Sequence, residues 1–319
     1  MSIAFGLGLA EFPFSGAAPF WRWVEMCEEG GVDSLWQNDR LISGEPFLEC
    51  MSLMAALAGA TKRIKFGMNV ASAGLRDPLL LAKQCATIDM LSNGRLLPAF
   101  GVGSPRGPEW QATGRPHTGA GAMAEEAIEI MARLWTEESV TFKGRHFQYQ
   151  NARIAPQPIQ NPLPLWIGGS SDAAIRRPAR FGTGWQGGSE TPDETRPIVA
   201  RIKAAAAKLG RTIDEDHFGI GIPYRLGKWT DRGIAERAEA YRKRLGRDPS
   251  QIFAVGDAGT IVERIRAYID AGVVKFILRP IGEGDADIVD QTRRVIAEIA
   301  PEIKAMNTAR RAAKKAAKP

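Results

Sequence analysis

The sequence predicts one α/β domain, a single (β/α)8 TIM barrel with an insertion after its fourth strand. Its 319 residues suffice for one large α/β domain. Short apolar stretches alternate with longer amphipathic segments along the whole chain, which is typical of strand–helix units. Small and polar residues follow the apolar stretches, as they do where ligands meet the carboxyl ends of barrel strands. We therefore expect a barrel over residues 1–306 and a basic flexible tail over 307–319. A doubly wound sheet is the alternative, because a strand count alone does not close a barrel.

The first half of the chain alternates regularly between expected strands and helices. The strands are expected at 3–10, 32–37, 64–71 and 95–103, and the first three helices at 18–30, 45–61 and 76–94. The third helix is the clearest, because Asp77 can cap it, Pro78 occupies its first position and Gly94 can end it. Apolar residues three to four positions apart between Met123 and Leu134 indicate a fourth helix.

The second half resumes this alternation after an interruption. Residues 138–163 alternate like a hairpin around Lys143 and Gly144 and then become proline-rich, so we expect an insertion there. The later strands are expected at 163–171, 183–189, 217–224 and 273–280, with a short one at 252–256. The later helices are expected at 172–181, 192–209, 230–245, 257–272 and 285–304.

Composition and charge argue against several classes of protein. No apolar run approaches the roughly 18 residues of a membrane-spanning helix, and the first residues do not resemble a signal peptide. We therefore expect a cytoplasmic protein without a membrane partner. The net charge is +6, but residues 307–319 carry five basic residues and no acidic one. The remainder is nearly neutral, so we expect no nucleic-acid partner; a basic arm that binds nucleic acid is the less favoured alternative.

The cysteines and histidines give no sign of a metal site. The three cysteines lie far apart in apolar helical patterns, which is typical of small buried side chains. The three histidines are scattered and form no pair with the spacing of zinc ligands. These residues are Cys27, Cys50, Cys85, His117, His146 and His217.

Several expected strands end in residues that could bind a ligand. Four polar residues, Gln37 to Arg40, follow the second strand and form either a solvated turn or the rim of a pocket. The segment from Gly168 to Ser171 places free amides and two hydroxyls between a strand and a helix, which suits a phosphate, although an ordinary turn has the same composition. Glu109 follows a glycine-rich strand and is either a loop acid or, more simply, a surface carboxylate.

Six stretches, in their order along the chain, resemble the luciferase-like flavin monooxygenase family, the bacterial luciferase type of TIM barrel. They include "EEGGVDSLWQNDR", "ALAGATKRIKFGMNV", "RDPLLLAKQCATIDMLSNGRLLPAFGVGS" and "ARFGTGW". The segment "ATIDMLSNGR" before a glycine-rich strand is the most specific of these motifs. Together the stretches span most of the chain.

The resemblance implies a reduced flavin cofactor, either FMN or the deazaflavin F420, across the carboxyl ends of the strands. It implies a non-prolyl cis peptide at Asn69–Val70, behind the flavin ring. The flavin phosphate is expected at Gly169, Ser170 and Ser171. The cofactor-binding candidates are Asn69, Val70, Gly101, Gly103, Ser104, Gly168, Gly169, Ser170 and Ser171.

Arg40 is a departure from the family pattern. Many relatives end the second strand with Asp-His, whereas this chain has Asp39-Arg40. Arginine stays protonated at any working pH and cannot shuttle a proton as histidine does. It can hold an anion or stabilise negative charge. We therefore expect Asp39, Arg40 and Glu109 to be the catalytic residues; a structural pair of Arg40 with Asp39 or Glu45 is the alternative.

Three kinds of function remain open. The first is the oxygenase component of a two-component FMNH2-dependent monooxygenase, which acts on a small organic substrate that could be anionic and receives FMNH2 from a separate flavin reductase. The second is an F420-dependent oxidoreductase that transfers a hydride. The third is a flavin-binding barrel without catalysis, or a Schiff-base lyase that uses Lys65 or Lys275. Family members usually form homodimers through helices near the second and third units, and the apolar segment 47–60 fits such a face.

Overall fold

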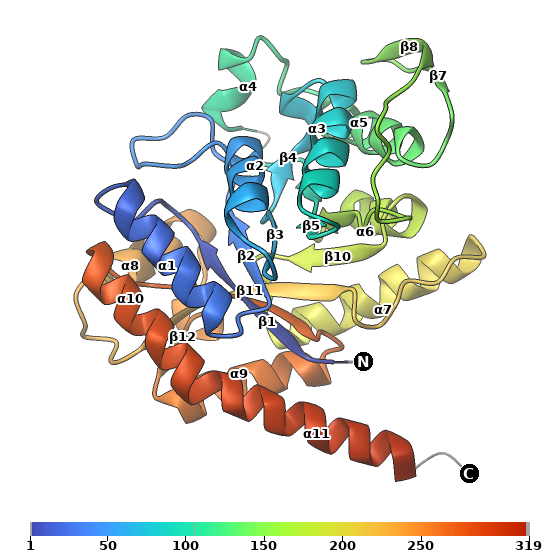
Figure 1. Cartoon of the computed structure of the whole chain (residues 1–319). Helices are drawn as coiled ribbons and strands as arrows, with labels where there is room; N and C mark the ends of the chain where they lie inside the picture. Colours follow the sequence, from blue (N-terminus) through green and yellow to red (C-terminus); the bar gives the residue numbers. More distant parts are fainter. Residues whose placement is uncertain (1, 105, 317–319) are drawn as a thin grey trace.

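The computed structural model describes residues 2–104 and 106–316, and its centre is a curled parallel sheet surrounded by helices (Figure 1). The sheet runs in the order β4-β6-β9-β10-β11-β13-β1-β2-β3-β5, with β12 paired to β11. Its strands are β1 Ala4–Leu9, β2 Ser34–Gln37, β3 Lys65–Met68, β4 Ala71–Ser72, β5 Leu96–Leu97, β6 Ala99–Gly101, β9 Trp166–Gly168, β10 Gly184–Gly187, β11 Phe218–Leu226, β12 Ala254–Gly256 and β13 Lys275–Pro280. The fold is therefore α/β and TIM-barrel-like, and no helix of the described residues is both long and apolar enough to span a bilayer.

The strands at the two ends of this order, β4 and β5, each adjoin another strand of the sheet along the chain. Only Asn69 and Val70 separate β3 from β4, and only Pro98 separates β5 from β6. Proline interrupts a strand because it has no N–H to donate to the ladder. β3 pairs with β5 and β4 pairs with β6, all in parallel, so the sheet curls strongly.

The helices pack around the outside of the sheet. They are α1 Ala17–Glu29, α2 Cys50–Ala60, α3 Pro78–Leu91, α4 Pro108–Ala112, α5 Ala120–Leu134, α6 Asp172–Arg180, α7 Pro192–Lys208, α8 Ile234–Leu245, α9 Ala258–Asp270, α10 Gly284–Arg294 and α11 Ala300–Ala316. The cap predicted for α3 is present: Asp77 accepts a hydrogen bond from the backbone N–H of Leu80 at 3.0 Å, and Pro78 begins the helix.

Indole rings and glycines are matched inside the curled sheet. A Cβ on Gly67 would lie 2.7 Å from the Trp36 ring, and one on Gly184 would lie 2.9 Å from the Trp166 ring. Such separations are too short for real atoms, so glycine at both positions leaves the room that the rings fill. Both rings belong to one cluster, against which Val70 packs. This cluster forms the floor beneath the carboxyl ends of the strands.

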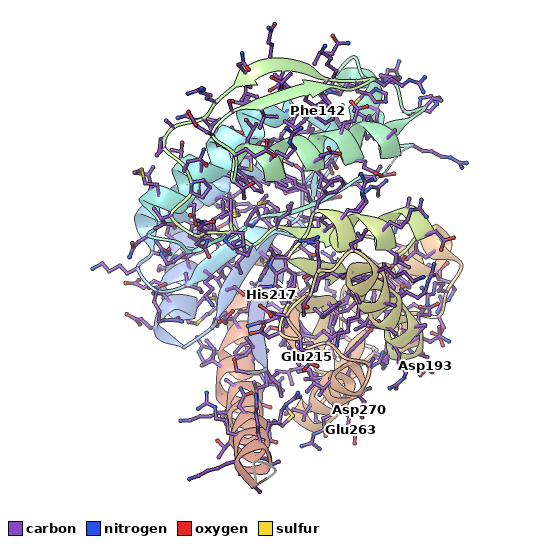
Figure 2. All side chains as sticks on the ribbon, turned by 90° about the vertical axis from the view of Figure 1, so that its right-hand side faces the viewer. Phe142, Asp193, Glu215, His217, Glu263 and Asp270 are labelled. Atoms are coloured by element: carbon purple, nitrogen blue, oxygen red, sulfur yellow. The ribbon has the colours of Figure 1, made fainter. Side chains whose placement is uncertain are left out.

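A separate antiparallel hairpin interrupts the alternation, as the sequence predicts. β7 Val140–Lys143 pairs with β8 Gln148–Ala152, and Figure 2 shows Phe142 of this hairpin beyond the helices at one end of the molecule. Glu126 of α5 accepts hydrogen bonds from the backbone N–H groups at the turn, those of Arg145, His146 and Phe147. One carboxylate therefore fixes the hairpin to α5.

The last helical segment extends further than the sequence suggests. α10 leads through a π-helical turn, Val295–Ile299, into α11, which runs to Ala316 and projects from the body of the molecule (Figure 1). The side chain of Asn307 accepts from the N–H of Ile3 at 2.7 Å and donates to its carbonyl at 2.8 Å. The expected boundary at 306 thus falls within a helix, at a point where that helix is fastened to the start of the chain. Residues 317–319 of the expected tail lie outside the described residues.

Candidate active site

Two adjoining cavities open at the carboxyl ends of the strands. The smaller, about 240 Å³, lies between the segments that follow β2, β3 and β6. The larger, about 820 Å³, lies between the ends of β1, β11 and β13 and one face of α8. Asn38 and Arg40 line both cavities, so the two adjoin, and we call them together the cleft. Three of the four polar residues, Asn38 to Arg40, therefore lie at the rim of a pocket, whereas Gln37 is buried at the end of β2.

Val70 forms a shelf at the bottom of the smaller cavity. The peptide bond between Asn69 and Val70 is cis, which confirms what the family resemblance implies. A Cβ on Gly101 would lie 2.9 Å from Val70 Cγ2, and one on Gly168 would lie 3.0 Å from the same atom. The valine side chain can lie across the ends of β6 and β9 only because both positions are glycine. Four of the candidate cofactor residues are thus brought together.

Gly103 and Ser104 border the same cavity. Gly103 has φ +72°, and any Cβ there would collide with Ser72 Oγ, so both conformation and space require glycine. The carbonyl of Ser104 accepts a hydrogen bond from Trp110 Nε1 at 2.9 Å. That bond fixes the loop after β6 over the cavity.

Asp39 is held by a neighbour that sequence reasoning missed. Its carboxylate accepts two hydrogen bonds from the Arg76 guanidinium, at 2.7 and 2.8 Å, and a third from the N–H of Ser72 at 3.0 Å. Its side chain is 1% exposed. Burial alone would lower the pKa of Arg76, but the hydrogen bonds to Asp39 and nearby negative charge outweigh it and raise that pKa further above its usual value. The hydrogen bonds that the Asp39 carboxylate accepts all come from neighbouring protein groups, so they stabilise the fold.

Arg40 pairs with Glu109, and with neither of the partners considered from the sequence. Arg40 Nη1 lies 3.2 Å from Glu109 Oε1, and the residues are 69 positions apart in the chain. Glu109 is 4% exposed, so the surface-carboxylate interpretation is wrong. The pair closes the loop after β6 onto the loop after β2. Sequence could place both groups at strand ends but could not place the two loops against each other.

The expected phosphate segment is a helix cap beside the cleft. Ser171 Oγ accepts from the N–H of Ala174 at 3.2 Å and so caps α6. Gly169 has φ +110°, and its carbonyl accepts from Trp185 Nε1 at 2.8 Å. Gly169, Ser170 and Ser171 are exposed, and none of the three borders either cavity. The amides at the start of α6 remain available to an anion, while one of the two hydroxyls is already in use.

The lysines considered for a Schiff-base lyase lie at the wrong end of the sheet. Lys65 and Lys275 are the first residues of β3 and β13, whereas the cleft lies where the strands end. Lys65 Nζ also lies 3.7 Å from Asp33 Oδ1. Neither lysine lines a cavity, so this alternative is not supported.

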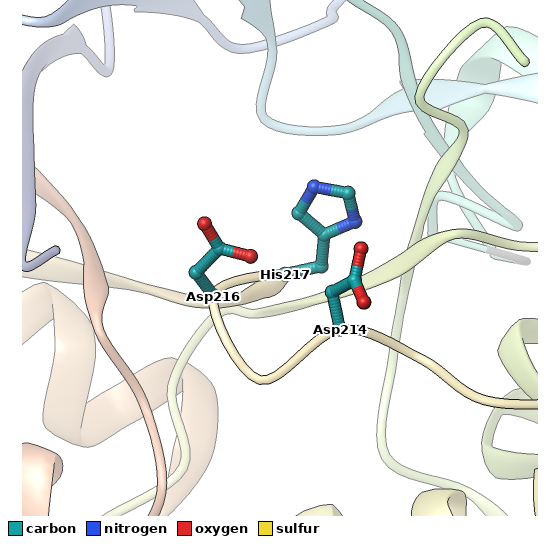
Figure 3. A group of neighbouring side chains, drawn as sticks. All are labelled: Asp214, Asp216 and His217. Atoms are coloured by element: carbon teal, nitrogen blue, oxygen red, sulfur yellow. The ribbon is translucent and has the colours of Figure 1, made fainter. Parts of the chain in front are cut away.

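One group of possible metal ligands stands at that same far end. Asp214, Asp216 and His217 lie in the loop before β11, and Figure 3 shows their side chains around that loop. His217 Nδ1 lies 2.9 Å from the carbonyl oxygen of Thr183, so this ring nitrogen already has a hydrogen-bond partner. Figure 2 shows His217 well separated from Phe142 of the hairpin. Within residues 2–104 and 106–316 nothing else marks this group as a binding site.

Three residues of the larger cavity were not predicted as site residues. Arg279 is the penultimate residue of β13, and Tyr241 and Arg244 lie on the cavity face of α8. Burial, and then the nearby charge of Arg244, lower the pKa of Arg279 to about 10. The sequence marks Arg279 as a strand-end residue, but the helical spacing of Tyr241 and Arg244 does not reveal which way α8 faces.

The curled sheet, with a cleft at the carboxyl ends of its strands, defines a TIM-barrel-like protein. The sequence model described as luciferase-like monooxygenase matches residues 15–250, and the chain belongs to that family. An uncharacterized protein of Mycobacterium tuberculosis (strain ATCC 25618 / H37Rv) is 35% identical over 213 residues, which cover 64% of this chain and 72% of that protein. The F420-dependent glucose-6-phosphate dehydrogenase of Amycolatopsis mediterranei (strain U-32) is 26% identical over 317 residues, which cover 88% of this chain and 92% of that enzyme.

Solved structures show the same fold. The monooxygenase RslO1 from Streptomyces bottropensis has a TM-score of 0.79 and 19% identity, with 94% of this chain and 99% of that chain covered. An F420-dependent secondary alcohol dehydrogenase in complex with an F420-acetone adduct has a TM-score of 0.78 and 19% identity, with 93% and 98% covered. The protein is thus an enzyme of a family whose members use FMN or F420, which removes the non-catalytic alternative.

Proposed function

We propose that this protein is the oxygenase component of a two-component FMNH2-dependent monooxygenase that acts on a small organic substrate. A separate flavin reductase would supply the FMNH2. The observation that carries the proposal is the shelf formed by Val70 over Gly101 and Gly168, at the bottom of a cleft lined by a fixed cation. A flat apolar surface of this kind suits one face of a flavin ring.

The residues around the shelf fit the cofactor. A flavin ring has an apolar face and a polar edge, so it needs hydrogen-bonding groups beside an apolar surface. Asn38 Oδ1 is buried beside the cleft and has no hydrogen-bond partner in the described chain. Asn69 and Val70 would hold the ring, Gly103 and Ser104 would border it, and the amides of Gly169 and Ser170 would face the phosphate. When bound, reduced FMN would supply the two electrons that activate oxygen.

The chain's own contribution is electrostatic. Glu109 holds Arg40 at the cleft, where the guanidinium can stabilise negative charge that develops during the reaction. No histidine of the described residues borders either cavity, and Asp39 is occupied by Arg76. Oxidation of an alcohol by hydride transfer requires a group that takes the hydroxyl proton. The two carboxylates of the smaller cavity, Asp39 and Glu109, are both held by arginines, which favours an oxygenase and gives Asp39 a positioning role.

An F420-dependent oxidoreductase is the second candidate. It is supported by the similarity to the F420-dependent glucose-6-phosphate dehydrogenase over most of both chains. In this candidate the Glu109 carboxylate would have to take the substrate proton. The same shelf would hold the deazaflavin ring.

We infer that the curled sheet is a closed barrel of eight strand–helix units and that residues 138–163 are an insertion on it. β3 and β4 together form one briefly interrupted strand, and β5 and β6 form the next one. The pairings of β3 with β5 and of β4 with β6 join these two strands, which links the two ends of the strand order and supports closure. The separate sheet formed by β7 and β8 supports the insertion.

Separate titrations with FMN and F420 test the proposed function. We expect the protein to bind reduced FMN, and the reduced complex to consume oxygen faster than free FMNH2 when substrate is present. Oxygen-independent turnover with F420 alone would replace this proposal by the second candidate. If neither cofactor bound, both candidates would be wrong.

A further inference from the structure

The larger cavity has one wall that is built as a separate unit. α8 packs with the segment before β12 in a small apolar cluster of its own. Within it Phe253 contacts Tyr241 edge to face, with ring centroids 5.1 Å apart, and stacks on Trp229 at 6.4 Å. Arg237, Tyr241 and Arg244 follow each other at intervals of four and three residues and so share the face of α8 that lines the cavity.

Arg279 enters the cavity from the opposite side without a charged partner. A Cβ on Gly221 would lie 3.4 Å from both Cζ and Nε of Arg279, so the guanidinium packs directly over that glycine. Its Nε is buried and has no hydrogen-bond partner, and its Nη2 has only a long contact of 3.5 Å to the carbonyl of Gly188. Within the described chain no carboxylate oxygen lies within 4.0 Å of it.

Two other arginines of the same cavity are paired with acids, which distinguishes Arg279 from them. Arg40 pairs with Glu109, and Arg237 Nη2 lies 2.7 Å from Glu11 Oε2. The acids that line the cavity without such pairing, Glu45 and Glu236, are exposed. Water screens charges at the rim much more than a charge in the interior. The unbalanced charge is therefore the inner, positive one.

Tyr241 is a second group that lacks a partner. Its side chain borders the cavity and is 7% exposed, and its hydroxyl has no hydrogen-bond partner in the described chain. A buried hydroxyl left unsatisfied destabilises the free protein, so a ligand that accepts its hydrogen bond is favoured. Arg244 lies at the exposed rim of the same wall and has no carboxylate within 4.0 Å among the described residues. Arg279 Nε and the Tyr241 hydroxyl inside the cavity thus have no acceptor among the described residues, and the Arg244 guanidinium at its entrance has no carboxylate partner among them.

We propose that Arg279 and Tyr241 bind an anionic group of the substrate, a carboxylate, phosphate or sulfonate, with Arg244 at the entrance. This inference rests on the proposed function, because it assigns the larger cavity to the substrate. The guanidinium fork matches the oxygens of such a group, and the tyrosine hydroxyl donates one more hydrogen bond. The anion would be held in the larger cavity, while the reacting part of the substrate lies toward Arg40 and the Val70 shelf.

A cofactor phosphate is the other possible source of such an anion. The cofactor phosphate is assigned to the start of α6, which follows β9, whereas Arg279 lies near the carboxyl end of β13. Two strands, β10 and β11, lie between β9 and β13 in the sheet. The placement therefore assigns the anion at Arg279 to the substrate.

Calorimetric titration with inorganic phosphate tests this inference, with sodium chloride at equal ionic strength as the reference. Phosphate is expected to bind the FMN-saturated protein in the millimolar range. Arg279→Gln is expected to raise its Kd at least tenfold, Arg279→Lys by less, and Tyr241→Phe several-fold. Arg153→Gln is the matched control, since Arg153 is 62% exposed, pairs with Glu138 and borders neither cavity, and it should change nothing.

Binding of FMN and of riboflavin to the same variants separates the outcomes. We expect both flavins to bind the Arg279 variants as they bind the parent. If Arg279→Gln weakens FMN but not riboflavin, the site holds the cofactor phosphate and the inference is wrong. It is also wrong if phosphate binds the parent and Arg279→Gln equally, or binds neither. A protein that binds phosphate through Arg279 but binds neither FMN nor F420 would contradict the proposed function and leave the anion site in place.

Discussion

Asp39 and Arg40 are neighbours in the sequence and lie in different electrostatic surroundings. The Asp39 carboxylate faces inward to Arg76, and the Arg40 guanidinium faces the cleft and Glu109. The sequence could place both at a strand end, because four consecutive polar residues follow a buried strand. Their partners are 37 and 69 positions away and depend on how the loops fold together, which no local pattern records.

Arg40→Leu is expected to lower turnover at least tenfold, about 1.4 kcal/mol of transition-state stabilisation. It also leaves Glu109 buried without its cation, so the melting temperature should fall as well. The double variant Arg40→Leu/Glu109→Gln removes the unpaired charge. Steady-state kinetics and thermal denaturation should show stability largely regained and turnover still low. Recovery of turnover in the double variant would mean that Arg40 only fixes the loop.

Asp39→Asn is expected to destabilise the fold by about 3 kcal/mol, because it leaves the Arg76 guanidinium largely buried and without its main partner. Urea denaturation measures the free energy of unfolding. Activity per folded molecule should fall much less than in Arg40→Leu. A variant as stable as the parent but inactive would instead give Asp39 a direct chemical role.

At the scale of elements, periodic patterns predicted strands, helices and the hairpin well, because each depends on nearby residues. The end of the last helix was less predictable, since residues 307–316 continue as helix. Asn307 makes two hydrogen bonds to the backbone of Ile3, just before the first strand. A run of alanine and basic residues has no strong apolar stripe, so the sequence suggested a tail. The cavity wall formed by α8 was also hidden, since its orientation depends on β12 and on the cluster around Phe253.

Gly101→Val tests the shelf, since the new side chain would displace Val70 from its place across the strand ends. We expect FMN affinity to fall at least tenfold while the protein still folds. Gly59→Ala, on the exposed face of α2 with nothing within 4 Å of its new Cβ, is the control and should bind FMN normally. Fluorescence titration measures both affinities. Equal affinity in the two variants would contradict the placement of the ring.

At the scale of the whole molecule, the apolar segment suggested as a dimer face serves mainly as core. Met51, Leu53, Met54 and Leu57 of α2 are buried within the protein itself. The neighbouring helix α3 exposes larger apolar side chains, those of Leu80, Met90 and Leu91, at 54%, 48% and 68%. The homodimer therefore remains a proposal, and α3 is the better candidate for its interface.

Leu91→Asp is expected to shift the protein toward monomer without lowering its stability, because Leu91 lies outside the core. Leu209→Asp is the matched control, since Leu209 is 54% exposed beyond the end of α7. Sedimentation velocity over a range of concentrations should separate the two. A parent protein that is monomeric throughout would remove the dimer proposal.

The tryptophans beneath the Val70 shelf also give the enzyme an internal optical reporter. Trp36 and Trp166 lie on one side of Val70, so a flavin ring on the other side would be only one side chain away. An excited indole passes its energy to a nearby isoalloxazine, so cofactor binding should quench their ultraviolet emission. Trp229 lies near the other cavity, stacked on Phe253, and would respond to the substrate. Although the chain has eight tryptophans, single Trp→Phe variants could assign each signal, so one fluorimeter could follow both ligands without a label.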